Sequence, residues 1–259
     1  MKKSNFIFLM SIFLTGVFFA CKKDKNESPQ PSTPAVTIPK IKTETDSLDN
    51  STTIYFYNSA GKVYKILYHD GSYDTVIYAA NSITVKGYKI NPLTLSYEMV
   101  FNLNNKGLAT SAWQINYNGS KKTNNSLFKT FLFNNSKTSK TNDTITIQYF
   151  YNTNDNMIKV IYNNNDTITF NYDNIGNLIS TVSYGYTINY EYYTDKTNTI
   201  GYYNFGIYFL GKDSKNLVKS EIQNTYTRNF NYTFDSNNRV SKKRQITSNY
   251  QNTTTYTYY

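Results

Sequence analysis

Residues that carry much of enzyme chemistry are scarce in this chain, which has one cysteine, one histidine and one tryptophan among 259 residues. A single cysteine excludes an intrachain disulfide. The one histidine, His69, leaves a zinc site short of ligands and would have to serve in any Ser-His-Asp or Cys-His arrangement. It stands beside Asp70-Gly71, which is typical of a surface residue next to a turn. No Gly-rich phosphate loop or dinucleotide fingerprint is present, so the sequence predicts no metal site and no cofactor.

Acidic residues are also few, with 17 Asp and Glu against 27 Lys and Arg, and the formal net charge is +10. A basic chain can bind nucleic acid. Here the basic residues are scattered, and the densest groups are only Lys22-Lys23, Lys121-Lys122 and Lys242-Lys243-Arg244. We interpret them as solvated surface charge and predict no nucleic-acid partner.

Long apolar runs are missing except at the N-terminus, where two lysines precede a segment from Phe6 to Phe19. That segment is too short for a comfortable membrane-spanning helix, and a small residue follows it, as in signal peptides. Its end, Phe18-Phe19-Ala20-Cys21, resembles a lipobox, the recognition site of the bacterial lipoprotein signal peptidase. The departure from the pattern is Phe18, where leucine is usual.

The resemblance implies cleavage before Cys21, and a diacylglyceryl thioether and an N-acyl chain on that cysteine. Two or more acyl chains suffice for stable anchoring. The alternatives are an ordinary signal peptide with a coincidental cysteine, or a retained anchor helix. The charged run Lys22-Lys23-Asp24-Lys25 is similar to those of surface lipoproteins of the Bacteroidetes. We therefore predict a signal peptide over residues 1–20 and an outer-membrane lipoprotein whose partner is membrane lipid, with surface and periplasmic exposure both left open.

Residues 21–50 have the composition of a tether. Four of the five prolines lie there, separated by Ser, Thr, Glu and Lys. Such a segment cannot bury a core, so we predict that it is disordered and holds the folded part away from the membrane. From residue 51 the pattern changes to a period of two, which predicts a β domain over residues 51–259. A chain that starts near Ser51 is then expected to fold on its own.

The composition favours β-sheet, with 27 Tyr and 16 Phe in the whole chain. Segments 145–151 and 168–172 alternate aromatic or aliphatic residues with polar ones, which indicates half-buried antiparallel strands. We predict an all-β fold, an antiparallel meander of hairpins forming a large twisted or rolled open sheet, with a β-sandwich as the alternative. A membrane-spanning barrel, suggested by the terminal aromatic Tyr259, is disfavoured because the strands lack a lipid-facing apolar band.

The turns between these segments share one form, with Asn or Asp first and Gly, or another residue that tolerates positive φ, fourth. Five segments have it: 58–61, 104–107, 173–176 and, more loosely, 152–155 and 235–238. The stretch from Phe170 to Leu178 resembles the YD repeats of Rhs-type wall proteins. With the lipobox and the tether, it resembles a family of uncharacterised Bacteroidetes lipoproteins built from such hairpins. The resemblance implies a fold class and no activity.

The functional prediction is non-enzymatic binding of a glycan or a protein partner at the cell envelope, because aromatic faces such as that of Trp113 can stack on sugar rings. The same aromatics can instead fill the core and the cross-strand pairs. The rival is a carboxylate-based glycan hydrolase with two acids facing each other across a cleft. Its candidate acids are Glu98, Asp143, Asp155, Asp166, Glu191, Asp195 and Glu221. We assign none of them a catalytic role.

Four Asp-hydroxyl-aliphatic motifs resemble the acceptor motif for O-glycosylation of exported Bacteroidetes proteins. Their hydroxyl residues are Ser47, Thr75, Thr144 and Thr167. Ordinary hairpin chemistry explains the last three, because an Asp ends a turn and the Thr begins a strand. It does not explain Ser47 in a segment predicted to be tether, so Ser47 is the first site expected to be modified.

Overall fold

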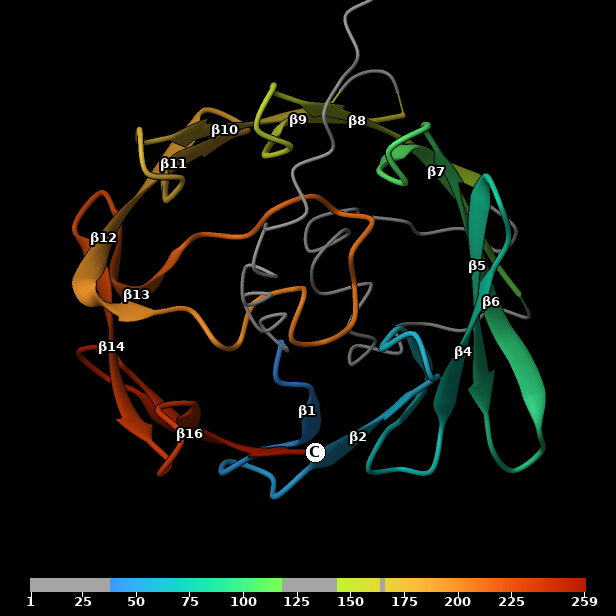
Figure 1. The fold of residues 1–259 in the computed structure, drawn as a ribbon, viewed down its shortest axis with the longest axis horizontal. Coiled ribbons are helices and arrows are strands. Elements are labelled where there is room, and N and C mark those ends of the chain that lie inside the picture. Colours follow the sequence, from blue (N-terminus) through green and yellow to red (C-terminus); the bar gives the residue numbers. More distant parts are fainter. Residues whose placement is uncertain (1–37, 118–143, 164–165) are drawn as a thin grey trace, which may run out of the picture. The chain divides into compact units, whose positions relative to one another are not determined.

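The computed structural model describes residues 38–117, 144–163 and 166–259, which form one closed antiparallel β-barrel (Figure 1). The sixteen strands of this described part follow one another around the barrel in chain order. Their bounds are β1 Ile41–Asp46, β2 Thr52–Tyr57, β3 Val63–Leu67, β4 Tyr73–Tyr78, β5 Ser82–Lys89, β6 Thr94–Leu103, β7 Ala109–Asn116, β8 Thr144–Tyr151, β9 Met157–Tyr162, β10 Asp166–Tyr172, β11 Leu178–Ser183, β12 Tyr186–Thr197, β13 Asn216–Gln223, β14 Tyr226–Phe234, β15 Val240–Ile246 and β16 Gln251–Tyr258. Within the same residues we find no helix with the length and apolar character needed to cross a membrane.

The barrel closes because its first and last strands pair. The β1–β16 ladder runs from Ile41 opposite Tyr258 to Asp46 opposite Thr254. Within this ladder, the hydroxyls of the paired residues Thr43 and Thr257 hydrogen bond at 2.6 Å, although they are 214 positions apart in the chain. The prediction of an open sheet or a sandwich is therefore wrong, although the all-β class and the hairpin order are confirmed. Local sequence patterns report strands and turns, and closure is a contact between the two ends of the domain.

Strand β1 lies inside the segment that the sequence predicted to be tether. It pairs with β2 as well as with β16, and its first residue, Ile41, is fully buried. The strand has only six residues, four of them Lys, Thr, Glu and Thr in a row, which is also the composition of a linker. Pairing on both edges makes it a strand, and the folded part therefore begins about ten residues earlier than expected.

The five predicted turns are confirmed, and they share one hydrogen-bond arrangement. The Asn58 Oδ1 atom accepts the backbone N–H of Ala60 at 3.0 Å and of Lys62 at 3.1 Å. Asn104, Asn152, Asp173 and Asp235 do the same in their own turns. The fourth turn residue has positive φ each time, at Gly61, Gly107, Asp155, Gly176 and Asn238. All five join an even to an odd strand, so they lie at one end of the barrel, here called the turn end.

Side chains from β2 to β9 fill much of the barrel interior. Alternate residues of a barrel strand point inward, and in these strands the inward residues are buried, among them Val63, Ile66, Val85, Met99, Phe101, Ile147 and Val160. The outward residues between them stay accessible. Most of the strand residues in the core thus come from the β2–β9 side of the barrel.

Tyrosine hydroxyls inside the barrel satisfy backbone carbonyls of the neighbouring strand. Tyr57 donates to the Ile41 carbonyl at 2.7 Å, and Tyr78 donates to the Val63 carbonyl at 2.8 Å. The same contact recurs on three later strand pairs, where Tyr192, Tyr232 and Tyr258 donate to Leu178, Val218 and Val240. Phenylalanine could not make this bond, which gives a physical reason for tyrosine at these inward positions.

The loop between β12 and β13, residues 198–215, crosses the interior and is here called the plug (Figure 1). Its apolar side chains Phe205, Ile207, Phe209 and Leu210 are buried in the core. The Ala109 backbone N–H donates to the Phe209 carbonyl at 2.8 Å, and the Phe209 ring lies 4.8 Å from that of Phe101. The plug therefore completes the core that the strands begin.

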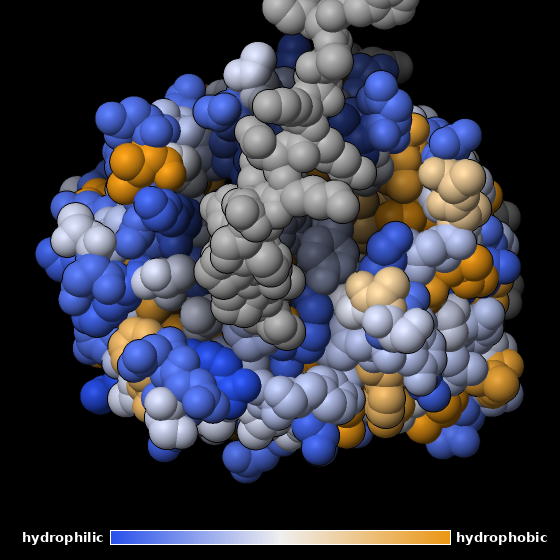
Figure 2. Space-filling view, viewed as in Figure 1, coloured by the Kyte–Doolittle hydropathy of each residue, from blue (hydrophilic) through white to orange (hydrophobic). Residues whose placement is uncertain are grey.

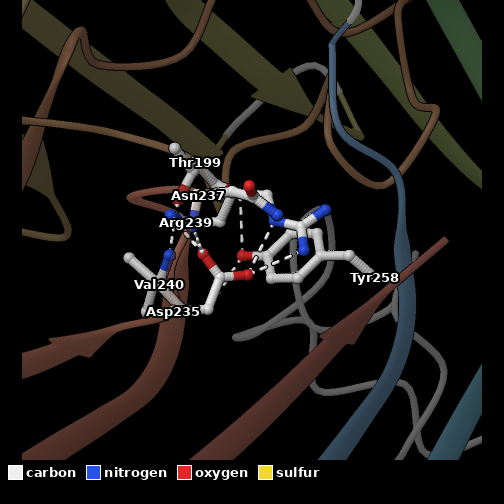
Figure 3. A network of polar contacts seen from close by, with 6 residues as sticks. All are labelled: Thr199, Asp235, Asn237, Arg239, Val240 and Tyr258. Carbon is white, nitrogen blue, oxygen red and sulfur yellow. Dashed lines mark hydrogen bonds and ion pairs between the residues drawn. The ribbon is translucent and has the colours of Figure 1, made fainter.

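A polar network attaches the first residues of the plug to the turn end (Figure 3). The Val240 backbone N–H, at the start of β15, donates to the Thr199 hydroxyl at 2.9 Å. In the preceding turn, Arg239 Nε donates to the Asp235 carboxylate at 2.7 Å. The guanidinium also lies over the Tyr258 ring, 4.4 Å from its centre. The start of the plug is thus fixed at the turn end by the β14–β15 turn, β15 and β16.

Candidate functional site

The inner wall formed by β10, β11 and β12 differs from the packed side, because every residue of these strands keeps part of its surface accessible. Thr181 of β11 stands opposite Phe170, which packs on the core, so this face is the inner one. The inward Tyr186 is 57% exposed and Tyr226 of β14 is 46% exposed. We name this region, with its charged neighbours, the inner patch: Glu44, Tyr186, Tyr190, Glu221, Tyr226, Arg228 and Lys243.

The strand registers bring the patch together. Glu221 of β13 stands between Tyr190 of β12 and Arg228 of β14. Lys243 of β15 stands opposite Tyr232, which packs on the core and therefore points inward. Glu44 of β1 is opposite the buried Tyr256 of β16. Because side chains alternate along a strand, each of these residues faces the barrel interior.

An ion pair joins two members of the patch. Arg228 donates through one terminal nitrogen to Glu221 Oε2 at 2.7 Å, and the two side chains are 37% and 26% exposed. Exposure of this size keeps the net stabilisation small. The Arg228 Nε atom is buried and has no hydrogen-bond acceptor among the described residues. The ion pair therefore leaves the buried Nε donor of the guanidinium without an acceptor among the described residues.

Lys243 is a cation in the patch without a bonded anion. Its Nζ atom lies 4.6 Å from the centre of the Phe230 ring, and no carboxylate of the described residues is within ion-pair distance of it. Burial lowers the pKa of Lys243, and the negative charges of Glu221 and Glu44 oppose that shift. The amino group of Lys243 can therefore donate hydrogen bonds to a molecule in the interior.

Glu44 has an environment unlike that of Glu221. The Tyr55 hydroxyl donates to Glu44 Oε2 at 2.9 Å. Burial raises the pKa of Glu44, while the Tyr55 hydrogen bond and the charge of Lys243 act against the increase. The two carboxylates of the patch thus have different partners, because Glu221 pairs with a guanidinium and Glu44 accepts from a phenol.

Of the seven acids considered for hydrolysis, Glu221 alone belongs to the inner patch. Glu98 forms an ion pair with Lys86 on the outer face, and Asp155 pairs with Lys106 in a turn. The remaining four are Asp143, which lies outside the described residues, and Asp166, Glu191 and Asp195, which lie on β10 and β12. No group of three or more metal-ligating side chains is found within the described residues.

The predicted modification sites do not form a cluster. Ser47 lies in the β1–β2 turn, where its hydroxyl accepts the Thr253 backbone N–H at 2.9 Å, so it is part of the barrel. Thr75, Thr144 and Thr167 lie on β4, β8 and β10. Cys21, the predicted lipid attachment site, lies outside the described residues. His69 is in an exposed turn, as predicted.

Sequence reasoning missed three charged members of the patch, which are Glu44, Arg228 and Lys243. Glu44 was placed in the tether, and Lys243 was interpreted as surface charge because it stands between Lys242 and Arg244. Period-two alternation was the available signal, because it puts Lys243 on the opposite face from both neighbours. Only the register with β14 decides which of the two faces is the inner one.

No family model matches the sequence, and no curated protein matches it. The fold is similar to that of solved structures. A porin-like protein from Bacteroides uniformis has 17% identity and a TM-score of 0.57, with 85% of this chain and 96% of that chain covered. A porin-like protein from Bacteroides vulgatus has 14% identity and a TM-score of 0.53, with 85% and 99% covered. At these identities the likeness shows the barrel fold alone.

Proposed function

We propose that the chain is an exported lipoprotein of the outer membrane, anchored by acyl chains on Cys21, whose barrel faces water and binds a glycan or a protein partner without catalysis. The observation that carries the proposal is the chemistry of the two faces of the wall. Most inward side chains of β2 to β9 are apolar or aromatic, whereas the charged side chains of Lys65, Lys86, Glu98 and Lys159 stand on the outer face of the same strands. A barrel embedded in lipid requires the opposite arrangement.

The outward charges are spread around the barrel. Lys86 of β5 and Glu98 of β6 stand opposite each other, between buried neighbours on both strands. Lys65 of β3 and Lys159 of β9 each adjoin an inward core residue and so point outward. A lysine or arginine on the lipid face costs about 2–4 kcal/mol at the bilayer midplane. Figure 2, viewed as in Figure 1 and so toward one end of the barrel, shows mostly hydrophilic residues around that end, with apolar residues in separate patches.

Strand length supports the same proposal. A strand that crosses a bilayer needs about 9–11 residues. Among the described strands only β6, β12 and β14 are longer than eight residues. The acyl chains on Cys21 then attach the protein to the membrane, as the resemblance of residues 18–21 to a lipobox implies. The porin-like likeness supports an envelope location at the level of the fold.

Membrane fractionation of a Cys21→Ser variant tests the proposal. Wild-type protein should remain in the outer-membrane fraction after washing with high salt and should be released by detergent. The variant should lack labelling by radioactive palmitate. It should then leave the membrane fraction without detergent, or accumulate as uncleaved precursor.

A bilayer-spanning barrel gives a different result in the same experiment, because its attachment would not depend on the cysteine. A Cys21→Ser variant that is processed yet stays in washed membranes would exclude the proposal. Ser47→Ala is the matched control, since it changes a hydroxyl residue of the β1–β2 turn and should leave fractionation unchanged.

A further inference from the structure

We infer that the inner patch is a binding site for a neutral oligosaccharide, which enters the barrel at the end opposite the turn end. The inference deepens the proposed function and rests on it, because it names the class of ligand for the same binding protein. It depends on the balance of charge in the patch, on its unused donors and on its accessible aromatic rings.

The charges of the patch balance. Glu44 and Glu221 oppose Arg228 and Lys243, so a ligand in contact with all four meets no excess of one sign. The plug adds Asp213, whose charge also acts on Lys243. Burial raises the pKa of Asp213, which opposes its ionisation, and its oxygens accept the backbone N–H groups of Tyr202, at 2.9 Å, and of Ser214, at 2.8 Å. A strongly charged ligand would have to be desolvated without compensation. A neutral ligand avoids that cost.

Several polar atoms of this wall have no protein partner among the described residues. They are the Arg228 Nε and the Ser183 Oγ, both buried, and the Lys243 Nζ, which has only its ring contact. Buried polar groups are nearly always hydrogen bonded. Hydroxyl and ring oxygens accept from such donors, and hydroxyl groups also donate to the carboxylates of Glu44 and Glu221. A polyhydroxylated molecule matches both needs.

Aromatic rings supply the remaining requirement of a sugar site. Tyr186 and Tyr226 begin neighbouring hairpin arms at the end opposite the turn end, and both are about half exposed. Tyr190 lies deeper on β12, where its hydroxyl hydrogen bonds with that of Thr181 at 3.2 Å. Apolar faces of sugar rings can pack on such rings, while polar groups fix orientation. An oligosaccharide that enters at this end would therefore contact the exposed tyrosines first and the charged groups of the patch afterwards.

Isothermal titration calorimetry on the full-length protein tests the inference. The protein is kept in a detergent without a sugar headgroup and titrated with oligosaccharides of equal length. The neutral probes are oligomers of glucose, mannose, xylose and N-acetylglucosamine. The charged probes are oligogalacturonate and oligomeric chitosan. At least one neutral probe should bind, and the charged probes should bind at least about tenfold more weakly, a difference of about 1.4 kcal/mol.

Matched variants locate the site. Lys243→Met and Tyr226→Ala should each weaken binding about tenfold, whereas Lys242→Met and Thr227→Ala, which change the adjacent outward residues, should not. Tyr226 is half exposed, so its variant should melt like the wild type and keeps the test valid if Lys243→Met unfolds.

Binding of charged probes alone, binding of no saccharide, or unchanged affinity in the Tyr226 variant would each overturn the inference. These results are independent of membrane fractionation. A protein released by Cys21→Ser that binds no sugar would retain the proposed anchoring and lose only the ligand class.

Discussion

At the scale of single residues, tyrosine is the side chain that both fills the barrel interior and satisfies its buried carbonyls. Its ring fills the space between strands, and its hydroxyl reaches a carbonyl that the neighbouring strand leaves free at a bulge. Tyr78 illustrates the contact, since its hydroxyl donates to the Val63 carbonyl at 2.8 Å and Val63 itself is fully buried. Without that donor, the carbonyl would remain buried and unpaired, which costs more than the bond itself contributes.

Replacement of Tyr78 by Phe should therefore lower the free energy of unfolding by about 1–2 kcal/mol, because the ring stays and only the hydrogen bond is lost. Denaturant unfolding followed by circular dichroism measures the change. Tyr64→Phe is the matched control, since Tyr64 is 46% exposed and should shift stability by less than about 0.5 kcal/mol. Equal effects of both variants would contradict the role of the buried hydroxyl.

At the scale of elements, the plug and the five turns depend on each other. The turn at 152–155 presents the Asp155 carbonyl, which accepts the Lys212 backbone N–H of the plug at 2.9 Å. At its other end, the Ile41 backbone N–H donates to the Asn204 carbonyl at 3.0 Å. The plug is thus held by elements on several sides of the barrel wall, and its apolar residues complete the core.

A Phe209→Ala variant should lose about 3–5 kcal/mol of stability, because the ring is 2% exposed and its removal leaves a cavity. Thermal and denaturant melts measure the loss. The control is Ile175→Ala, in an exposed turn with 52% of the side chain accessible, which should change stability by less than about 0.5 kcal/mol. If Phe209→Ala melts like that control, the plug is not part of the core.

At the scale of the whole molecule, closure of the barrel by β1 decides how many N-terminal residues can be removed without loss of the fold. A chain that starts at residue 38 keeps both ladders of β1, whereas a chain that starts at Ser51 loses them and exposes the edges of β2 and β16. Unpaired edges of this kind promote association between chains.

The chain from residue 38 should melt cooperatively at the temperature of the wild type, and the chain from residue 51 should melt much lower or aggregate. Differential scanning calorimetry and size-exclusion chromatography distinguish the two. Adding a synthetic peptide of residues 38–50 should restore part of the stability of the shorter chain. Equal melting temperatures for the two chains would show that β1 is dispensable.

Alkaline pH should destabilise the whole barrel through its buried phenols. Burial raises the pKa of Tyr258 to about 12, whereas an unfolded tyrosine titrates near about 10. The folded state binds this proton more tightly, so the stability it contributes is present below pH about 10 and is lost as pH rises through about 12. Burial lowers the pKa of Lys40 to about 8, which acts in the opposite direction between about 8 and about 10.5.

The free energy of unfolding should therefore fall most steeply above pH about 10.5. Denaturant melts at a series of pH values measure it, and phenolate absorbance should appear together with unfolding. If most tyrosines of the folded protein gave phenolate absorbance at pH about 10, the burial of their hydroxyls would be contradicted.

The sequence by itself determined the local structure of the barrel. Asn58, Asn104 and Asp173 specify their turns because a side-chain oxygen three bonds from Cα can accept nearby backbone N–H groups. The period of two specifies the strands. These features depend on neighbours within a few residues, and the structure confirms them.

Only the tertiary structure decided closure, the role of β1 and the inner patch. Glu44 and Lys243 sit in polar runs whose local chemistry fits a linker and a solvated surface equally well. They face the same interior because β1, β16 and β15 are neighbours in the sheet, which brings together residues from the two ends of the domain. A pairing of that kind depends on the total burial that the closed barrel achieves, and no single stretch of sequence encodes it.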